Sequence, residues 1–205
     1  MILAFDTSSE ACTAALFEAG GELIARADER IGRGHSERLV PMLDELLGGR
    51  RPSHILVGVG PGSFTGIRVA VAAAHGLAIG WGARLDGFSS LALLAAGAGQ
   101  TDEPVAAAIR GGHGQLFVQQ FAGATFEALG PVRSLVPEDA ARLITASRVI
   151  GSGAAELVEA RGSGEAAEAL PAAADVFRLP EALRSLEPKP VYVRAPDAKA
   201  KAVAA

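Results

Sequence analysis

A glycine-rich loop in the first half of this sequence has the residue types from which phosphate-binding turns are built. It follows an apolar run at residues 54–59 and precedes an alanine-rich run at residues 67–79, an order that predicts strand, tight turn and helix. Such a loop presents backbone N–H groups at a helix N-terminus, where anions bind readily. The loop has neither the Lys-Ser or Lys-Thr pair of a P-loop nor the glycine spacing of a dinucleotide-binding turn. Two interpretations therefore stay open, a phosphate-binding loop and a plain strand–helix turn with a Ser or Thr cap.

A second polar group, Asp6-Thr7-Ser8, follows the first predicted strand at residues 2–5. One interpretation is a bound metal ion, because carboxylate and hydroxyl oxygens suit magnesium. The other is a polar strand end whose carboxylate accepts hydrogen bonds from its own turn.

Other catalytic and metal-binding patterns are missing from the sequence. The single cysteine, Cys12, excludes a disulfide within the chain and a cysteine-based metal site, and its apolar surroundings predict a core residue. No two of the four histidines have the i, i+4 spacing of a zinc pair. The sequence has no Gly-x-Ser-x-Gly motif and no evident nucleophile–base pair, which argues against a protease. We assign no catalytic and no metal-ligating residue.

The composition is that of a globular protein. The 205 residues are 49% hydrophobic and 20% charged, and the net charge is −4. This charge argues against binding nucleic acid alone, and the aromatic content of 5% argues against a base-stacking platform. The N-terminus lacks the pattern of a signal peptide, and the apolar run at residues 69–81 contains His75 and two glycines and falls short of a membrane span. We expect a cytoplasmic protein without a membrane partner.

The predicted elements fall into two similar halves. The first half has strands at 2–5, 11–17 and 22–31, a helix at 35–47, a strand at 54–59, a helix at 67–79, a strand near 85 and a helix at 90–96. The second has strands at 104–109, 115–121 and about 126–135, helices at 137–145 and 154–161 around a strand at 148–150, and a segment at 165–174 that could be helix or loop. The tail from residue 188 to 194 is extended, and the last ten or so residues look frayed. This coarse repeat predicts an α/β fold with lobes at residues 1–100 and 101–205.

Four segments together resemble the bacterial TsaB (YeaZ) family: residues 2–12, residues 35–43, the glycine loop with its helix, and residues 190–194. The resemblance covers nearly the whole chain, and the loop is its most specific part. It implies an actin-like, Hsp70-related (ribonuclease H-like) fold of two duplicated lobes with mixed sheets flanked by helices. It also implies a scaffold subunit of the tRNA threonylcarbamoyladenosine synthase, which modifies N6 of adenosine 37.

The family also implies partners and a remnant nucleotide site. The expected partners are a TsaD-type catalytic paralogue and a TsaE-type ATPase, with a homodimer when the chain is alone and tRNA contacted only through the complex. No cofactor is firmly expected; ATP or ADP with magnesium would lie at the interface of the complex. The residues expected to shape a remnant nucleotide cleft are Asp6, Thr7, Ser8, Gly60, Gly62, Ser63 and Thr65.

The second lobe departs from the family pattern at one position. Actin-like ATPases use an acidic hairpin in each lobe to position magnesium and water. When the hairpins are aligned on Gly114, Arg110 stands where the family usually has aspartate. Because a guanidinium cannot ligate magnesium, the chain itself argues against ATP hydrolysis between the lobes.

The helices at 35–47 and 67–79 are more apolar than one core stripe requires, and the second should be buried on most sides. Either both helices sandwich the first sheet, or they donate to a helical bundle with a partner. The resemblance favours the partner. The predicted partner-binding residues are Leu39, Met42, Leu43, Leu46, Val71, Ala74, His75 and Ala78. On this reading Leu46→Glu or Ala74→Arg would weaken assembly and leave a folded monomer.

We therefore expect a non-catalytic scaffold that binds and activates the catalytic paralogue. The alternative is a weak actin-like ATPase or phosphotransferase, which would require magnesium-dependent turnover lost in Asp6→Ala. A protease or chaperone acting on the partner is the third reading.

Overall fold

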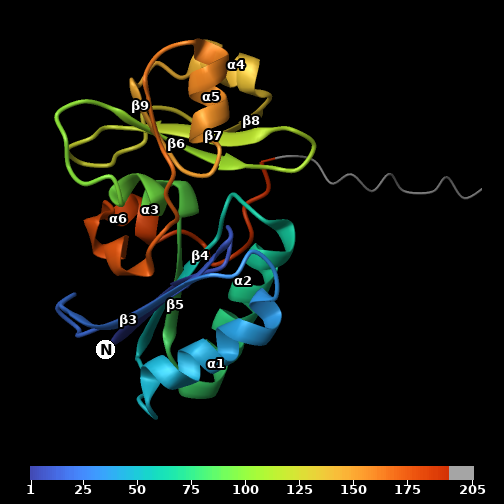
Figure 1. Ribbon diagram of the computed structural model, residues 1–205. Helices are drawn as coiled ribbons and strands as arrows, with labels where there is room; N and C mark the ends of the chain where they lie inside the picture. The colour runs from blue at the N-terminus through green and yellow to red at the C-terminus, as the bar shows by residue number, and fades with distance from the viewer. Residues whose placement is uncertain (194–205) are drawn as a thin grey trace, which may run out of the picture.

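The computed structural model describes residues 1–193, which form two lobes stacked one above the other (Figure 1). The first lobe contains a five-stranded sheet in the order β3-β2-β1-β4-β5. Its strands are β1 (Ile2–Asp6), β2 (Ala11–Phe17), β3 (Leu23–Arg30), β4 (His54–Gly58) and β5 (Arg84–Phe88). The first three strands form an antiparallel meander, and β4 and β5 run parallel to β1.

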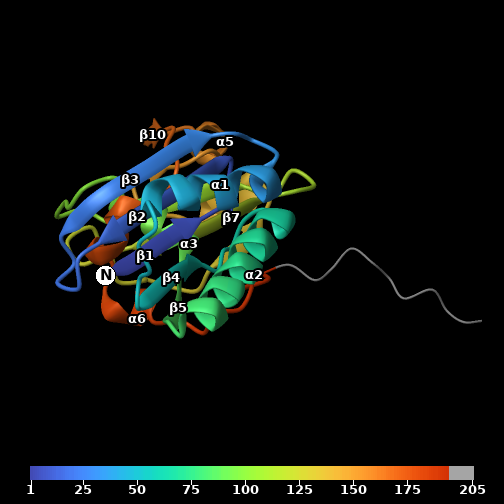
Figure 2. The ribbon, with the colours of Figure 1, turned by 90° about the horizontal axis from the view of Figure 1, so that it is seen from below.

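Helices α1 (His35–Leu47) and α2 (Phe64–Trp81) lie side by side on the outer face of this sheet (Figure 2). α1 buries one apolar stripe, which includes Leu39 and Leu43, and ends at Gly48 in the left-handed conformation. α2 buries a narrower stripe that includes Ile67 and Val71. Both stripes pack on side chains of β1, β2 and β4 and form one core cluster.

The second lobe repeats this arrangement. Its sheet has the order β8-β7-β6-β9-β10, which matches the first sheet strand for strand. The strands are β6 (Val105–Arg110), β7 (Leu116–Phe121), β8 (Arg133–Leu135), β9 (Arg148–Ile150) and β10 (Glu165–Ala167). Helices α4 (Pro137–Leu143) and α5 (Ala154–Arg161) cover its outer face. The predicted duplication of two α/β lobes is therefore confirmed.

Three short helices fill the layer between the two sheets (Figure 1). They are α3 (Ser90–Ala96), the 3-10 helix η1 (Ala173–Arg178) and α6 (Glu181–Arg184). α3 follows the first-lobe strands but packs on β6 and β7, whereas η1 follows the second-lobe strands and packs on β1 and β2. The buried Thr13 hydroxyl accepts a hydrogen bond from the backbone N–H of Ala173 at 2.7 Å. The two lobes thus share one core, which fixes the space between their sheets.

Several predicted elements are confirmed with their bounds, namely the helices α1, α3 and α5 and the strand β9. Two predictions in the second half are wrong. Residues 165–174 begin with β10 rather than with helix or loop, because Glu165 to Ala167 pair with β9 in parallel. The strand expected at 126–135 is reduced to Arg133–Leu135, since Phe126 has a positive φ of 56° and Pro131 cannot donate a ladder hydrogen bond.

The C-terminal segment (residues 186–193) returns to the first lobe. Leu186 forms an antiparallel bridge with Gly87 of β5, and the N–H of Val191 donates to the carbonyl oxygen of Val59 at 2.9 Å. Residues between 173 and 193 therefore pack against the first sheet, although they follow the second in the sequence. Arg194 and the last ten or so residues, for which an extended and then frayed chain was expected, lie outside the described residues.

Candidate functional site

The carboxylate of Asp6, at the end of β1, is fully buried and hydrogen-bonded by its surroundings. Oδ1 accepts from the N–H and the hydroxyl of Ser8, both at 2.7 Å, and Oδ2 accepts from the hydroxyl of Ser90 at 2.5 Å. Burial raises the pKa of Asp6 above its ordinary value, and the hydrogen bonds from the two serines oppose this rise. Gly58 packs so closely on the carboxylate that a Cβ there would overlap it. Through these hydrogen bonds the Asp6 carboxylate links its own loop to α3.

The glycine loop packs directly on the Asp6 loop. The N–H of Ser63 donates to the carbonyl oxygen of Ser8 at 2.6 Å, and the Thr7 hydroxyl donates to the carbonyl oxygen of Gly66 at 2.7 Å. A Cβ on Gly62 or Gly66 would overlap the backbone of the Asp6 loop, so both positions require glycine. The Ser63 hydroxyl accepts from the N–H of Gly66 at 3.2 Å and caps α2, as the plain-turn interpretation expected.

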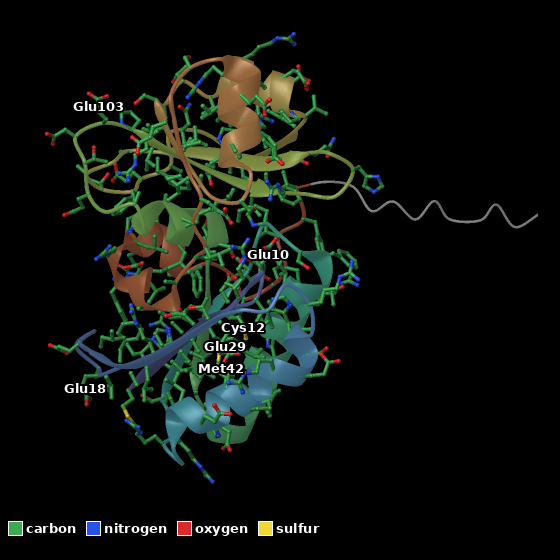
Figure 3. The ribbon with its side chains drawn as sticks, in the orientation of Figure 1. Glu10, Cys12, Glu18, Glu29, Met42 and Glu103 are labelled. Atoms are coloured by element: carbon green, nitrogen blue, oxygen red, sulfur yellow. The ribbon has the colours of Figure 1, made fainter. Side chains whose placement is uncertain are left out.

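A cleft of about 650 Å³ lies between the two lobes, beside these loops. It is lined by Ser8, Ser9, Glu10, Gly32, Pro61, Gly62, Ser63, Phe64, Thr65, Ile109, Arg110, Gly111, Gly112, Phe117, Ser152, Val191, Tyr192 and Val193. Figure 3 labels Glu10 where the first lobe faces the second. Four of the seven residues predicted for a nucleotide cleft line it, namely Ser8, Gly62, Ser63 and Thr65. Asp6, Thr7 and Gly60 lie behind this wall and hold its shape.

The sequence pointed to the second-lobe hairpin around Arg110, but it identified no other part of the second-lobe wall and no role for the C-terminal segment in the cleft. Phe117 and Ser152 carry no motif, and Tyr192 lies more than a hundred residues from the glycine loop that it meets. In the structure the Arg68 guanidinium lies 3.6 Å from the centre of the Phe64 ring and donates to the Tyr192 hydroxyl at 2.7 Å. These contacts place the C-terminal segment at the mouth of the cleft. Only the resemblance of its last residues to a family motif pointed to it.

The hairpin of the second lobe places Ile109, not Arg110, in the position symmetric to Asp6. Alternate residues of β1 and β6 face the layer between the sheets, and on β6 these are Val105, Ala107 and Ile109. Arg110 faces the other way, and its Nε donates to Glu156 of α5 at 2.6 Å. The expectation that Arg110 stands where the family usually has aspartate concerns the family's motif and stays a prediction. Neither candidate is acidic, so the chemical conclusion that no second carboxylate meets Asp6 is unchanged.

Among the described residues, no group of three or more His, Cys, Asp or Glu side chains could hold a metal ion. Cys12 is buried beside Met42, with their sulfur atoms 3.7 Å apart (Figure 3). Burial raises the pKa of the Cys12 thiol to about 11, so this cysteine is a core residue.

Six of the eight predicted partner-binding side chains lie in the core of the first lobe. Leu39, Met42, Leu43, Leu46, Val71 and Ala74 are each 9% exposed or less, because these faces of α1 and α2 rest on the sheet. Ala78 is half-buried, and His75 is exposed, with Nε2 2.9 Å from the carbonyl oxygen of Pro188. Leu46→Glu and Ala74→Arg would therefore disturb folding rather than assembly alone.

Within the single chain α2 is buried along one face only, so burial on most sides would need a partner and stays a prediction. Its outer face carries Phe64, Arg68, Ala72, Gly76, Ile79 and Gly80, and Ile79 is 83% exposed. α2 is also the one helix among the described residues with the length and mean hydropathy, 1.2, of a membrane span. Length and hydropathy of one helix are weak evidence for a membrane span. In this structure α2 packs along one face on the sheet of the first lobe.

Comparisons with known proteins show which family the chain belongs to. The family model described as TsaD, tRNA N6-adenosine threonylcarbamoyltransferase, matches residues 28–151, more than half of the chain. The solved structure of YeaZ from Pseudomonas aeruginosa superposes with a TM-score of 0.77 at 32% identity, over 93% of this chain and 98% of that one. The chain belongs to the TsaB (YeaZ) family. Together with the repeated strand order, this confirms the expected actin-like (ribonuclease H-like) fold of two duplicated lobes.

Curated members of the TsaB family share shorter regions with the chain. The tRNA threonylcarbamoyladenosine biosynthesis protein TsaB of Haemophilus influenzae is 43% identical over 84 residues, which is 38% of this chain and 35% of that protein. The TsaB protein of Escherichia coli is 38% identical over 102 residues, which is 47% of this chain and 43% of that protein. The chain thus matches less than half the length of these curated relatives.

Proposed function

We propose that this chain is a non-catalytic subunit in the threonylcarbamoylation of adenosine in tRNA, and that it binds and activates a TsaD-type catalytic paralogue through the outer face of α2. Support for the reaction comes from the TsaB relatives, which are named for threonylcarbamoyladenosine biosynthesis, and from the matching family model. The single observation that carries the partner role is the exposed apolar surface of α2.

Exposing this apolar surface to water is unfavourable for the isolated chain. Ile79 is 83% exposed and Phe64 is 50% exposed, while Val40 on the neighbouring helix α1 is 61% exposed. Large apolar side chains exposed on two neighbouring helices are candidates for contact with another protein. We propose the exposed residues of α2 as contact residues in place of the buried candidates named from the sequence. Of those eight candidates, His75 and Ala78 lie at the edge of the exposed face of α2.

The spacing of small residues on α2 favours a helix as the partner element. Ala72, Gly76 and Gly80 recur every fourth residue on the exposed face, and a Cβ on either glycine would meet nothing within 4 Å. Glycine in a helix interior costs about 1 kcal/mol relative to alanine. No described part of the chain covers Gly76 or Gly80. A helix of a partner could therefore pack closely against these small residues.

The variants Ile79→Glu and Gly76→Leu test the proposal. Both change exposed positions, so the isolated chain should stay folded, as circular dichroism would verify. Isothermal titration with the purified catalytic paralogue should show at least about tenfold weaker binding for each. Leu143→Glu on α4 is the matched control, because this leucine is also an exposed helical aliphatic, at 49%. Wild-type affinity for folded Ile79→Glu and Gly76→Leu would rule out this face.

The same face would serve a homodimer when the partner is absent, so the homodimer and the complex with the paralogue would exclude each other. A TsaE-type ATPase would join only the assembled complex, and tRNA would be contacted through it. A nucleotide with magnesium would lie at the interface of the complex. As a subunit in tRNA modification, the protein would work in the cytoplasm. In this proposal the seven cleft residues named from the sequence maintain a remnant nucleotide cleft.

A further inference from the structure

Arg68, on the exposed face of α2, is held in place by two aromatic side chains. Its guanidinium carbon lies 3.6 Å from the centre of the Phe64 ring, and its Nε donates to the Tyr192 hydroxyl at 2.7 Å. The centres of the Phe64 and Tyr192 rings are 5.3 Å apart. Because the guanidinium both stacks on a ring and donates through Nε, it is ordered before any partner binds.

The other donors of this guanidinium are unused. Among residues 1–193, no carboxylate forms an ion pair with Arg68, and no group accepts a hydrogen bond from Nη1 or Nη2. α2 contains no acidic residue, and Arg68 is its one lysine or arginine. The outer face of α2 therefore presents a single uncompensated positive charge in an otherwise apolar surface.

Arg68 lies between the C-terminal segment and the small residues of α2. Two turns further along the helix, His75 Nε2 lies 2.9 Å from the carbonyl oxygen of Pro188, so the C-terminal segment follows one side of α2 (Figure 1). Ala72 and Gly76 follow Arg68 at steps of four residues, and both are exposed. A partner helix packed over these small residues would have one flank against the Arg68 guanidinium.

Covering Arg68 without pairing it would oppose binding, since removing a charge from water without a partner is strongly unfavourable. A carboxylate fits a guanidinium best, because its two oxygens accept from two parallel N–H groups. The Nε–H is already bonded to Tyr192, so a carboxylate would approach the end of the guanidinium, where Nη1 and Nη2 donate together.

We propose that the partner bound on α2 places an Asp or Glu carboxylate against Arg68, and that Tyr192 is a positioning residue that holds Arg68 for this contact. The inference rests on the proposed function and adds the chemistry of the partner surface, which is an apolar helix with an acidic side chain on one flank. It also gives the C-terminal segment a role in partner binding.

Isothermal titration with the purified catalytic paralogue tests the contact of Arg68. Arg68→Met should bind at least about tenfold more weakly than wild type, because it leaves a carboxylate of the partner unpaired. Arg68→Lys should recover only part of this loss, since an ammonium group lacks the planar pair of donors. Arg26→Met is the matched control, because this arginine of β3 is 64% exposed and lies at the edge of the sheet away from α2.

An exchange of charges identifies the carboxylate. Arg68→Glu should lose measurable binding, because it places two carboxylates against each other. Replacing the surface acidic residues of the paralogue by arginine, one at a time, should restore binding to Arg68→Glu in at least one case. Wild-type affinity in Arg68→Met, an equal loss in Arg26→Met, or the absence of any restoring replacement would overturn the proposal.

A double-mutant cycle tests the role of Tyr192. Tyr192→Phe keeps the ring and removes the hydroxyl, so it should weaken binding about threefold because Arg68 is less ordered before binding. In the Arg68→Met background the same change should have no further effect, whereas a purely structural effect would persist there. Equal effects of Tyr192→Phe in both backgrounds would refute the positioning role.

The wild-type titration separates this proposal from the one on which it rests. If the wild-type chain does not bind the paralogue, both proposals fail. If it binds, and Ile79→Glu weakens binding while Arg68→Met does not, the outer face of α2 remains the partner face and only the carboxylate contact is excluded.

Discussion

Replacing Gly66 by alanine should destabilise the first lobe, although alanine is the better helix former. Gly66 lies in the first turn of α2, and a Cβ there would overlap the carbonyl oxygen of Thr7. The carbonyl oxygen belongs to backbone and the position of a Cβ is fixed by the backbone of α2, so no flexible side chain can move away. The Asp6 loop and the glycine loop would have to separate.

The size of the effect follows from the contacts that hold the two loops together. Separation weakens the hydrogen bonds from the Thr7 hydroxyl to Gly66 and from the Ser63 N–H to Ser8, at about 1 kcal/mol each. Overpacking adds about 2 kcal/mol, and the helix propensity of alanine returns about 1 kcal/mol. The expected net loss is about 3 kcal/mol of unfolding free energy.

The matched control is Gly76→Ala, a glycine-to-alanine substitution at another position of α2. At Gly76 a Cβ would meet nothing within 4 Å, so Gly76→Ala should gain up to about 1 kcal/mol from helix propensity. The two variants should thus shift stability in opposite directions, with about 4 kcal/mol between them.

Urea unfolding measures both effects, at a protein concentration low enough that sedimentation shows the chain and both variants to be monomeric. The single tryptophan, Trp81, is the last residue of α2, so its fluorescence reports on the first lobe. With a slope of about 2 kcal/mol per molar urea, the midpoint of Gly66→Ala should fall by about 1.5 M. A midpoint for Gly66→Ala within about 0.3 M of wild type, or equal losses in both variants, would refute the role of close backbone packing.

Two further predictions concern buried titratable groups. Burial raises the pKa of Asp6 above 3.8, so its stabilising contribution is present below that pH and is lost as pH rises through the folded-state pKa. The stability of Asp6→Asn relative to wild type should therefore increase from about pH 3 to pH 7 in urea titrations, and a pH-independent difference would contradict this. Cys12, with its pKa raised to about 11, should react with a thiol reagent at pH 8 at least about a hundredfold more slowly in the native chain than in urea; equal rates would show that it is accessible.

Local signals explain the elements that could be predicted from the sequence. α1 has a clear apolar stripe and ends at two glycines, and α3 is capped by Ser89, whose hydroxyl accepts from the N–H of Ala92 at 3.2 Å. Such signals need no knowledge of the rest of the fold. The strand β10 has no local signal for a strand, because Glu165 to Ala167 are good helix formers. Parallel pairing with β9 overrides that propensity.

The candidate site was predictable only where it is continuous in sequence. The glycine loop and the Asp6 loop were both identified, yet their mutual packing, which buries Asp6, depends on the pairing of β1 with β4. Which flank of α1 and α2 faces the sheet could not be decided, since α2 is apolar almost all round. The sequence also did not show which face of β6 Arg110 takes, because the register and pleat of the strand decide this.

The most direct test of the central claim is sedimentation of the purified full chain with the catalytic TsaD-type paralogue of the same organism. We expect a complex that contains equal numbers of the two chains, and we expect Ile79→Glu to weaken this complex while Leu143→Glu does not. If the wild-type chains sediment independently at micromolar concentration, with tRNA and nucleotide present, the chain is not the partner-binding subunit proposed here.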